Sequence, residues 1–182
     1  MLPGVTEHDP WVELLDSARA GEAGASRARR RWLESSAAEG ATLAGVLLDL
    51  VGRDDLVLLG IEGGATASAH IVGVGADVVV FDRGTGPLFL VPLRRITTVH
   101  TSGRPPLGDR PPPDAPLLVD LLARTGDREE VVVLSLLDRT VVSGVVDVVG
   151  GDVVRVQPED RSLGPTYVSV ASIGEVAVFR SG

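Results

Sequence analysis

Apolar and polar positions divide the chain into an N-terminal part with helical spacing and a longer part with strand-like runs. An Asp-Pro pair, typical of an N-cap followed by proline at the first helical position, predicts a short helix over residues 10–20. Ser26 can cap a second helix, in which leucines and alanines recur at near-helical spacing as far as Val51. Gly52 then supplies a natural C-terminal stop.

After Asp55 the apolar runs become short, β-branched and separated by Gly, Asp or Arg, which is typical of strands joined by turns. Residues 102–114 are rich in proline and predict a linker without regular structure, and residues 116–125 then predict another helix. The expected strands are LVLLGI, AHIVGV, DVVVF, LFLVPL and ITTVHT before the linker, and EVVVLSL, TVVSGVVDVV, DVVRVQ, TYVSV and EVAVF after it.

One stretch of the chain recurs almost unchanged: SAHIVGVGADVVVF is followed, 75 residues later, by SGVVDVVGGDVVRV. The alignment runs without a gap from the preceding helix, and the last strands realign at a shift of 77. Because the identities include polar turn residues, we interpret the chain as a duplicated unit of one helix and about five strands. The expected parts are an N-terminal helical segment (1–38), a first unit (39–101), the linker (102–114) and a second unit (115–180).

The repeated unit resembles a small SH3-like barrel and, more narrowly, the Sm-like family that includes the bacterial RNA chaperone Hfq. VVVLSLLDRTVVSGVVDVVGGDVV is similar to the first Sm motif, with an acidic turn at Asp138 and a strand glycine at Gly144. RRITTVHT is similar to the end of the second motif. The resemblance implies a mainly β (α+β) fold, with two tandem five-stranded barrels behind an N-terminal helical segment. The order of parts is also similar to a set of uncharacterised actinobacterial proteins.

The resemblance implies RNA as a ligand, although the RNA pocket of Hfq is not reproduced. Where Hfq has a Gln-Phe pair, the two units have Ala-Asp and Gly-Asp, ending at Asp77 and Asp152. An aspartate repels phosphate, and no aromatic ring is present there for base stacking. The Tyr-Lys-His cluster of Hfq also lacks a counterpart, so that only Arg94, with Arg95 beside it, could reach a phosphate.

The N-terminal part contains the one run of basic residues. On a helix these side chains would cover most of the circumference, which favours a solvated face over binding to RNA phosphates or an acidic partner. The run consists of Arg27, Arg29, Arg30 and Arg31.

Composition narrows the function classes. The 182 residues are 44% hydrophobic and carry a net charge of −8. The negative charge argues against extensive electrostatic binding to nucleic acid or to an anionic membrane. Cysteine is absent, which excludes disulfides, thiolate zinc sites and cysteine nucleophiles. Without a secretory signal or a long apolar run, we expect a cytoplasmic protein without a membrane span.

Candidate catalytic and metal-binding groups are few. His8, His70 and His100 are more typical of a tail and of strand surfaces than of a metal site. Ser68 lies near His70, but no nucleophile-elbow motif or orienting acid accompanies the pair. We therefore expect no enzyme activity, no cofactor and no metal.

The polar residues that recur in both units are Asp77 and Asp152, each two positions after a glycine, Gly75 or Gly150. They could form a carboxylate pair for metal or catalysis. Equivalent positions in separate barrels need not meet, so a structural Gly-x-Asp turn is the favoured interpretation.

These observations predict a non-catalytic binding or assembly protein, with RNA as the first ligand to test. The alternative is a protein–protein adaptor without a nucleic-acid ligand, which would use the barrel edges or the N-terminal helices. Unpaired strand edges invite pairing, either between the barrels of one chain or in a homo-oligomer.

Overall fold

The computed structural model describes most of the chain from residue 39 onward. The chain divides into two units, Met1–Gly40 and Ala41–Gly182, and the elements below belong to the second. The helix expected over residues 10–20, most of the segment 1–38 and the basic run lie outside the described residues. The described residues are 32, 39–53, 55–84, 86–103, 105–160 and 162–179.

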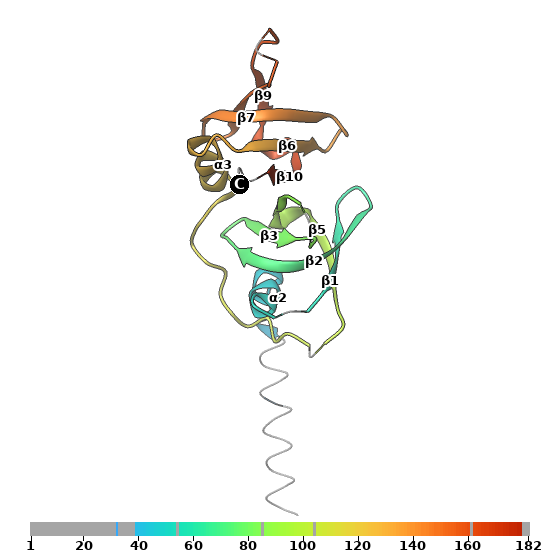
Figure 1. Cartoon of the computed structure of the whole chain (residues 1–182). Coiled ribbons are helices and arrows are strands. Elements are labelled where there is room, and N and C mark those ends of the chain that lie inside the picture. Colours follow the sequence, from blue (N-terminus) through green and yellow to red (C-terminus); the bar gives the residue numbers. More distant parts are fainter. Residues whose placement is uncertain are drawn as a thin grey trace, which may run out of the picture. The chain divides into compact units, whose positions relative to one another are not determined.

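The described part of the chain is mainly β, with ten antiparallel strands and two α-helices, which confirms the mainly β part of the expected fold class (Figure 1). The elements before the linker are α2 (Leu43–Leu50), β1 (Val57–Ile61), β2 (Ala65–Val74), β3 (Val78–Asp82), β4 (Leu88–Pro92), the 3-10 turn η1 (Leu93–Arg95) and β5 (Ile96–Thr101). Those after it are α3 (Leu118–Asp127), β6 (Val131–Leu136), β7 (Val141–Val149), β8 (Val153–Gln157), β9 (Thr166–Ser169), η2 (Val170–Ser172) and β10 (Ile173–Phe179).

The strands are hydrogen-bonded in the order β5-β1-β2-β3-β4-β10-β6-β7-β8-β9. We call β1–β5 the first half-sheet and β6–β10 the second. They join where β4 pairs with β10, with Leu90 opposite Val176 and Leu88 opposite Val178. This pairing, the junction, leaves β5 and β9 at the two ends of the strand order.

Strand pairing in the two half-sheets follows the same register. Leu59 lies opposite Ala67 in the first half-sheet, and Leu134 lies opposite Val142 in the second, at the same shift of 75. The bulge at Ile71/Gly73 likewise recurs at Val146/Val148. The matching registers place corresponding residues on corresponding faces of the two half-sheets.

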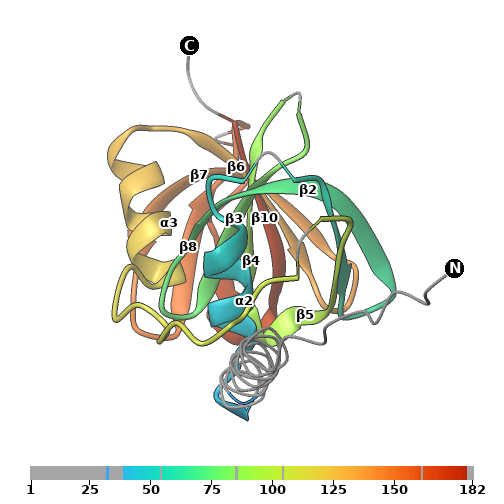
Figure 2. The same ribbon diagram turned by 90° about the horizontal axis from the view of Figure 1, so that it is seen from below.

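Each half-sheet has a hydrophobic core closed by its helix. In the first, Leu47 of α2 is buried with residues of the strands, including Leu59 and Phe81. The core of the second half-sheet also includes Val78 and Leu90 from the first, so the packing is continuous across the junction. α3 packs against β7 of the second half-sheet (Figure 2).

The expectation of one helix running unbroken to Val51 is wrong. Gly40 lies in a turn, Ala41 and Thr42 are not helical, and α2 begins at Leu43. Thr42 is the N-cap, because its hydroxyl accepts a hydrogen bond of 3.0 Å from the Gly45 amide. A glycine followed by a capping threonine therefore separates this helix from the preceding residues.

The proline-rich linker, which has no helix or strand in its described residues, is held against α2. The amides of Leu107 and Gly108 donate to Asp49 Oδ2 at 2.9 and 3.0 Å. The Gly108 amide is the main cause of the lowered pKa of Asp49. A Cβ on Gly45 would lie only 2.1 Å from the Gly108 carbonyl oxygen, so a glycine is required where the linker crosses the helix.

Candidate binding surfaces

At the junction, the guanidinium of an arginine stacks on an aromatic ring. Arg83, just after β3, places its guanidinium 3.7 Å from the centroid of the Phe89 ring on β4. Its Nη2 also donates to Glu175 Oε2 on β10 at 2.6 Å. Phe81 stacks on Phe89 at 5.6 Å between centroids. Charge pairing and cation–π stacking thus act together beside the β4–β10 ladder.

The two arginines predicted to reach phosphate lie in η1 and point across the junction to η2. Arg94 Nη2 donates to the Val170 carbonyl at 3.2 Å, and Arg95 Nη2 donates to the Ala171 carbonyl at 2.7 Å. Arg95 also pairs with Glu62 through Nη1. Its side chain is only 14% exposed, and one of its two amino groups bonds across the junction while the other pairs within the first half-sheet.

Arg94 differs from Arg95 because it remains exposed. Arg94 and Arg95 are the predicted phosphate contacts that the structure describes, and Arg94 is the more accessible of the two. Sequence reasoning placed the two arginines together but missed their partners, because those carbonyls lie 76 positions away along the chain. The basic run of residues 27–31 lies outside the described residues.

The recurring Gly-x-Asp segments lie in the hairpin turns between β2 and β3 and between β7 and β8. The Gly75 amide donates to the Val78 carbonyl at 2.7 Å, and the Gly150 amide donates to the Val153 carbonyl at 2.8 Å. Backbone hydrogen bonds therefore close both turns in the same way. Asp152 occupies the position in the second turn that Asp77 has in the first.

The first of these turns also serves the second half-sheet. Asp77 Oδ1 accepts a hydrogen bond of 2.7 Å from the Leu118 amide at the start of α3. The Ala76 amide donates to the Pro116 carbonyl at 2.9 Å. A Cβ on Gly75 would lie 2.2 Å from that carbonyl oxygen. The turn thus caps a helix that lies about forty residues further along the chain.

An acidic hollow lies in the second half-sheet, between the end of α3 and strands β7 and β8. It consists of two adjoining pockets that share Glu129 and Asp147, with Asp127 in one and Glu159 in the other. Arg155 Nε contacts Asp147 at 2.9 and 3.1 Å, and this hydrogen bond lowers the pKa of the Asp147 carboxyl.

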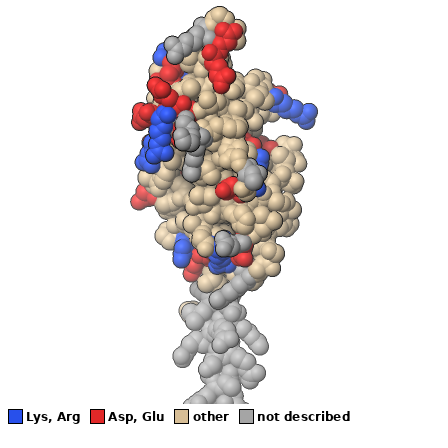
Figure 3. Space-filling model, in the orientation of Figure 1, with Lys and Arg blue, Asp and Glu red and all other residues tan. Residues whose placement is uncertain are grey.

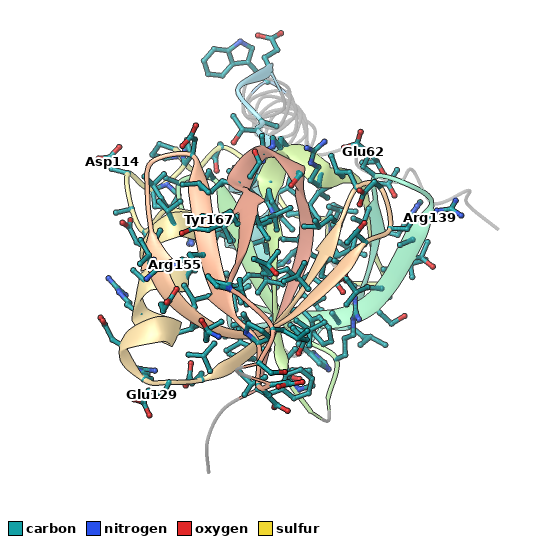
Figure 4. The ribbon with its side chains drawn as sticks, turned by 90° about the horizontal axis from the view of Figure 1, so that it is seen from above. Glu62, Asp114, Glu129, Arg139, Arg155 and Tyr167 are labelled. Atoms are coloured by element: carbon teal, nitrogen blue, oxygen red, sulfur yellow. The ribbon has the colours of Figure 1, made fainter. Side chains whose placement is uncertain are left out.

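In Figure 4, Arg155, Tyr167 and Glu129 lie along the same side of the molecule. Acidic side chains also gather around the β8–β9 end in the surface view (Figure 3). This part of the surface is therefore predominantly negative, and Arg155 forms an ion pair with Asp147 there.

The histidines do not form a metal cluster in the described part of the chain. His70 on β2 lies opposite Asp82, whereas His100 on β5 lies opposite Leu58 on the intervening strand β1. Ser68 on β2 also lies opposite Leu58. No group of three or more metal-ligating side chains is found among the described residues.

Comparison with known proteins finds no matching family model and no matching curated protein. Among the residues that the structure describes, neither helix combines the length and apolarity needed to cross a membrane.

Proposed function

We propose that this protein is a non-catalytic binding and assembly protein built from two Sm-like barrels. The first would consist of α2 and the first half-sheet, and the second of α3 and the second half-sheet. The identical registers and the repeated bulge support a duplicated unit. The observation that carries the proposal is the junction itself, where an edge strand of one unit binds an edge strand of the other.

Assembly beyond one chain would reuse the same geometry. By the repeat, β5 corresponds to β10, and β9 corresponds to β4, so the free strands at the two ends are the counterparts of the strands that pair internally. Free strand edges offer unpaired N–H and C=O groups to a partner. A second copy could therefore dock head to tail, with its β9 beside β5, in a heterologous interface.

RNA is the first ligand to test, and the exposed Arg94 is the described residue best placed to contact phosphate. The alternative, a protein adaptor without a nucleic-acid ligand, is favoured by the burial of Arg95 and by the acidic hollow around Glu129 and Asp147. The net charge of −8 adds repulsion toward phosphate.

The test is fluorescence anisotropy of the full chain with mixed single-stranded RNA, at low and at physiological salt, together with light scattering for mass. Binding that weakens steeply with salt and is reduced in Arg94→Ala would support RNA as the ligand. Arg139→Ala, which removes another exposed arginine, is the matched control. No anisotropy change at either salt concentration, with folded protein, would favour the adaptor. A monomeric mass at all concentrations would contradict self-assembly.

A further inference from the structure

The turn between β2 and β3 packs against the start of α3, whereas the equivalent turn between β7 and β8 is uncovered. In the first turn Gly75 is buried beside the Pro116 carbonyl, and the Asp77 carboxylate accepts a hydrogen bond of 2.7 Å from the Leu118 amide. Asp152, the counterpart of Asp77, is exposed. The structure therefore contains one turn seated on a helix and one equivalent turn that is not.

Glycine recurs in the uncovered turn, where nothing in the described part of the chain approaches as closely. At Gly75 a Cβ would lie 2.2 Å from the Pro116 carbonyl oxygen. At Gly150 the nearest atom is a Val153 side-chain carbon at 3.2 Å, and the backbone is outside the left-handed region that favours glycine. The close approach of another backbone, as at Gly75, would account for a glycine there.

The start of α2 offers the kind of site that the uncovered turn lacks. Through the shift of 75, Leu43 is the counterpart of Leu118, and it is exposed at the first position of α2. In the part of the chain that the structure describes, no hydrogen bond joins the Leu43 amide or the Asp152 carboxylate to another residue. Water can satisfy both groups, and it is their match to the observed bond of Asp77 with Leu118 that points to a second copy.

The linker leaves this site open. It crosses α2 at Thr42 and Gly45, where the Thr42 amide donates to the Gly108 carbonyl at 3.0 Å. On α3 the counterparts of these two residues are Leu117 and Asp120, and both are exposed. The linker on α2 and the first turn on α3 therefore use different faces of the two equivalent helices.

We propose that the start of α2 binds the β7–β8 turn of a second copy of this chain. The Asp152 carboxylate of one copy would accept a hydrogen bond from the Leu43 amide of the next, and Gly150 would lie against the Ala41 carbonyl. This contact rests on the head-to-tail assembly of the proposed function and names the residues at which the copies meet. Because turn and helix are different surfaces, each added copy leaves one of each open, and the contact can repeat.

The free strand edges support the same placement. Leu90 lies opposite Val176 at the junction, and the shift of 77 converts this pair into Tyr167 and Val99 on the free strands β9 and β5. Leu90 is buried, whereas Tyr167 is 64% exposed. Docking of a second copy would therefore cover a tyrosine, one of the residue types that most often anchor an interface.

The first experiment measures the mass of the full chain by light scattering at rising concentration. Gly150→Ala adds a Cβ where the carbonyl of the next copy would approach, and Asp152→Ala removes the acceptor. Each should weaken self-association by at least about tenfold while the circular dichroism spectrum stays unchanged. Gly151→Ala is the matched control and should leave self-association unchanged, because its counterpart in the seated turn is Ala76.

The outcomes separate this contact from the assembly on which it rests. A wild type that stays monomeric at all concentrations would contradict the assembly and this contact with it. If the wild type self-associates and the folded Gly150→Ala and Asp152→Ala variants do so equally strongly, the assembly stands and the contact between turn and helix is overturned.

The second experiment detects the contact by crosslinking, which does not depend on weakening it. The chain contains no cysteine, so Leu43→Cys and Gly151→Cys each introduce a single thiol. A short bismaleimide should link the two variants to each other in a mixture and should link neither variant to itself, because a head-to-tail contact joins different surfaces. Absence of linked dimers in the mixture, or equal linking of either variant alone, would overturn the proposal.

Discussion

The two half-sheets share their registers, but only the first sends arginines across the junction. In η1, Arg94 and Arg95 donate to carbonyls of η2. At the corresponding positions of η2, shifted by 77, the chain has Ala171 and Ser172. Ser172 donates only to the Ser169 carbonyl within its own turn. The two 3-10 turns therefore differ in their side-chain contacts. Those of η1 bond across the junction, whereas Ser172 of η2 bonds within its own turn.

The ion pair beside the junction shows the same asymmetry. Arg83 follows β3 and pairs with Glu175 on β10. Pro158 follows β8 at the position of Arg83, and Thr98 on β5 corresponds to Glu175, so neither charge is repeated at the free ends. At the junction, where β4 pairs with β10, charged side chains therefore add specificity to the backbone pairing. At the free ends, β5 and β9 lack these charged side chains at the corresponding positions.

The largest expected difference is between Gly75→Ala and Gly150→Ala, which occupy equivalent turns. A Cβ at Gly75 would lie 2.2 Å from the Pro116 carbonyl oxygen, whereas at Gly150 the nearest atom is a Val153 side-chain carbon at 3.2 Å. Gly75→Ala should lower the free energy of unfolding by about 2–3 kcal/mol, and Gly150→Ala by less than about 1 kcal/mol. Urea denaturation measures both, and equal losses would contradict the asymmetry of the two turns.

The next contrast is between Arg95→Ala and Ser172→Ala. Arg95 is largely buried and bonds to Ala171 and Glu62, whereas Ser172 makes its bond locally. Arg95→Ala should cost about 2 kcal/mol of unfolding free energy, and Ser172→Ala less than about 1 kcal/mol. Thermal and urea unfolding would check the ranking. A larger loss for the serine variant would show that the junction does not depend on the η1 arginine.

A smaller effect is expected for the pair of Arg83 and Glu175. Both side chains are partly exposed, so a double-mutant cycle with alanine should give a coupling free energy of about 0.5–1 kcal/mol. Salt should reduce the coupling, because screening weakens exposed charge pairs. A coupling of zero at low salt would mean that Arg83 acts only by stacking on Phe89.

The smallest expected effect concerns pH and the linker. The pKa of Asp49 is lowered in the folded protein, first by the Gly108 amide. Its stabilising contribution should therefore be complete above the ordinary aspartate pKa of about 4 and be lost as pH falls through the lower folded value. Asp49→Asn should flatten the fall of stability in this acid range. Urea denaturation from pH 5 to pH 2 would measure the slope, and an unchanged slope would contradict the role of Asp49.

Much of the secondary structure could be predicted because its signals are local. Alternating β-branched runs and turn residues gave strands close to those observed, and the helix expected over residues 116–125 overlaps α3. The missed break between Gly40 and Thr42 shows the limit, since near-helical spacing of apolar residues continues across it. There the capping hydroxyl of Thr42 outweighs the apolar pattern.

The binding surfaces were harder to predict because their parts come from distant positions. Arg95 and Ala171 are separated by 76 residues, and Asp77 and Leu118 by 41. The composition of residues 102–114 indicated a linker, yet nothing local showed that Asp49 holds it against α2.

By itself the sequence determined the mainly β class and the order of strands along the chain, because side-chain alternation and turn chemistry act over a few residues. Only the tertiary structure decided that β4 binds β10 and that Arg94 and Arg95 face η2. Every strand edge offers the same backbone donors and acceptors, so the choice of edge depends on packing and charge contacts that form only when distant segments meet.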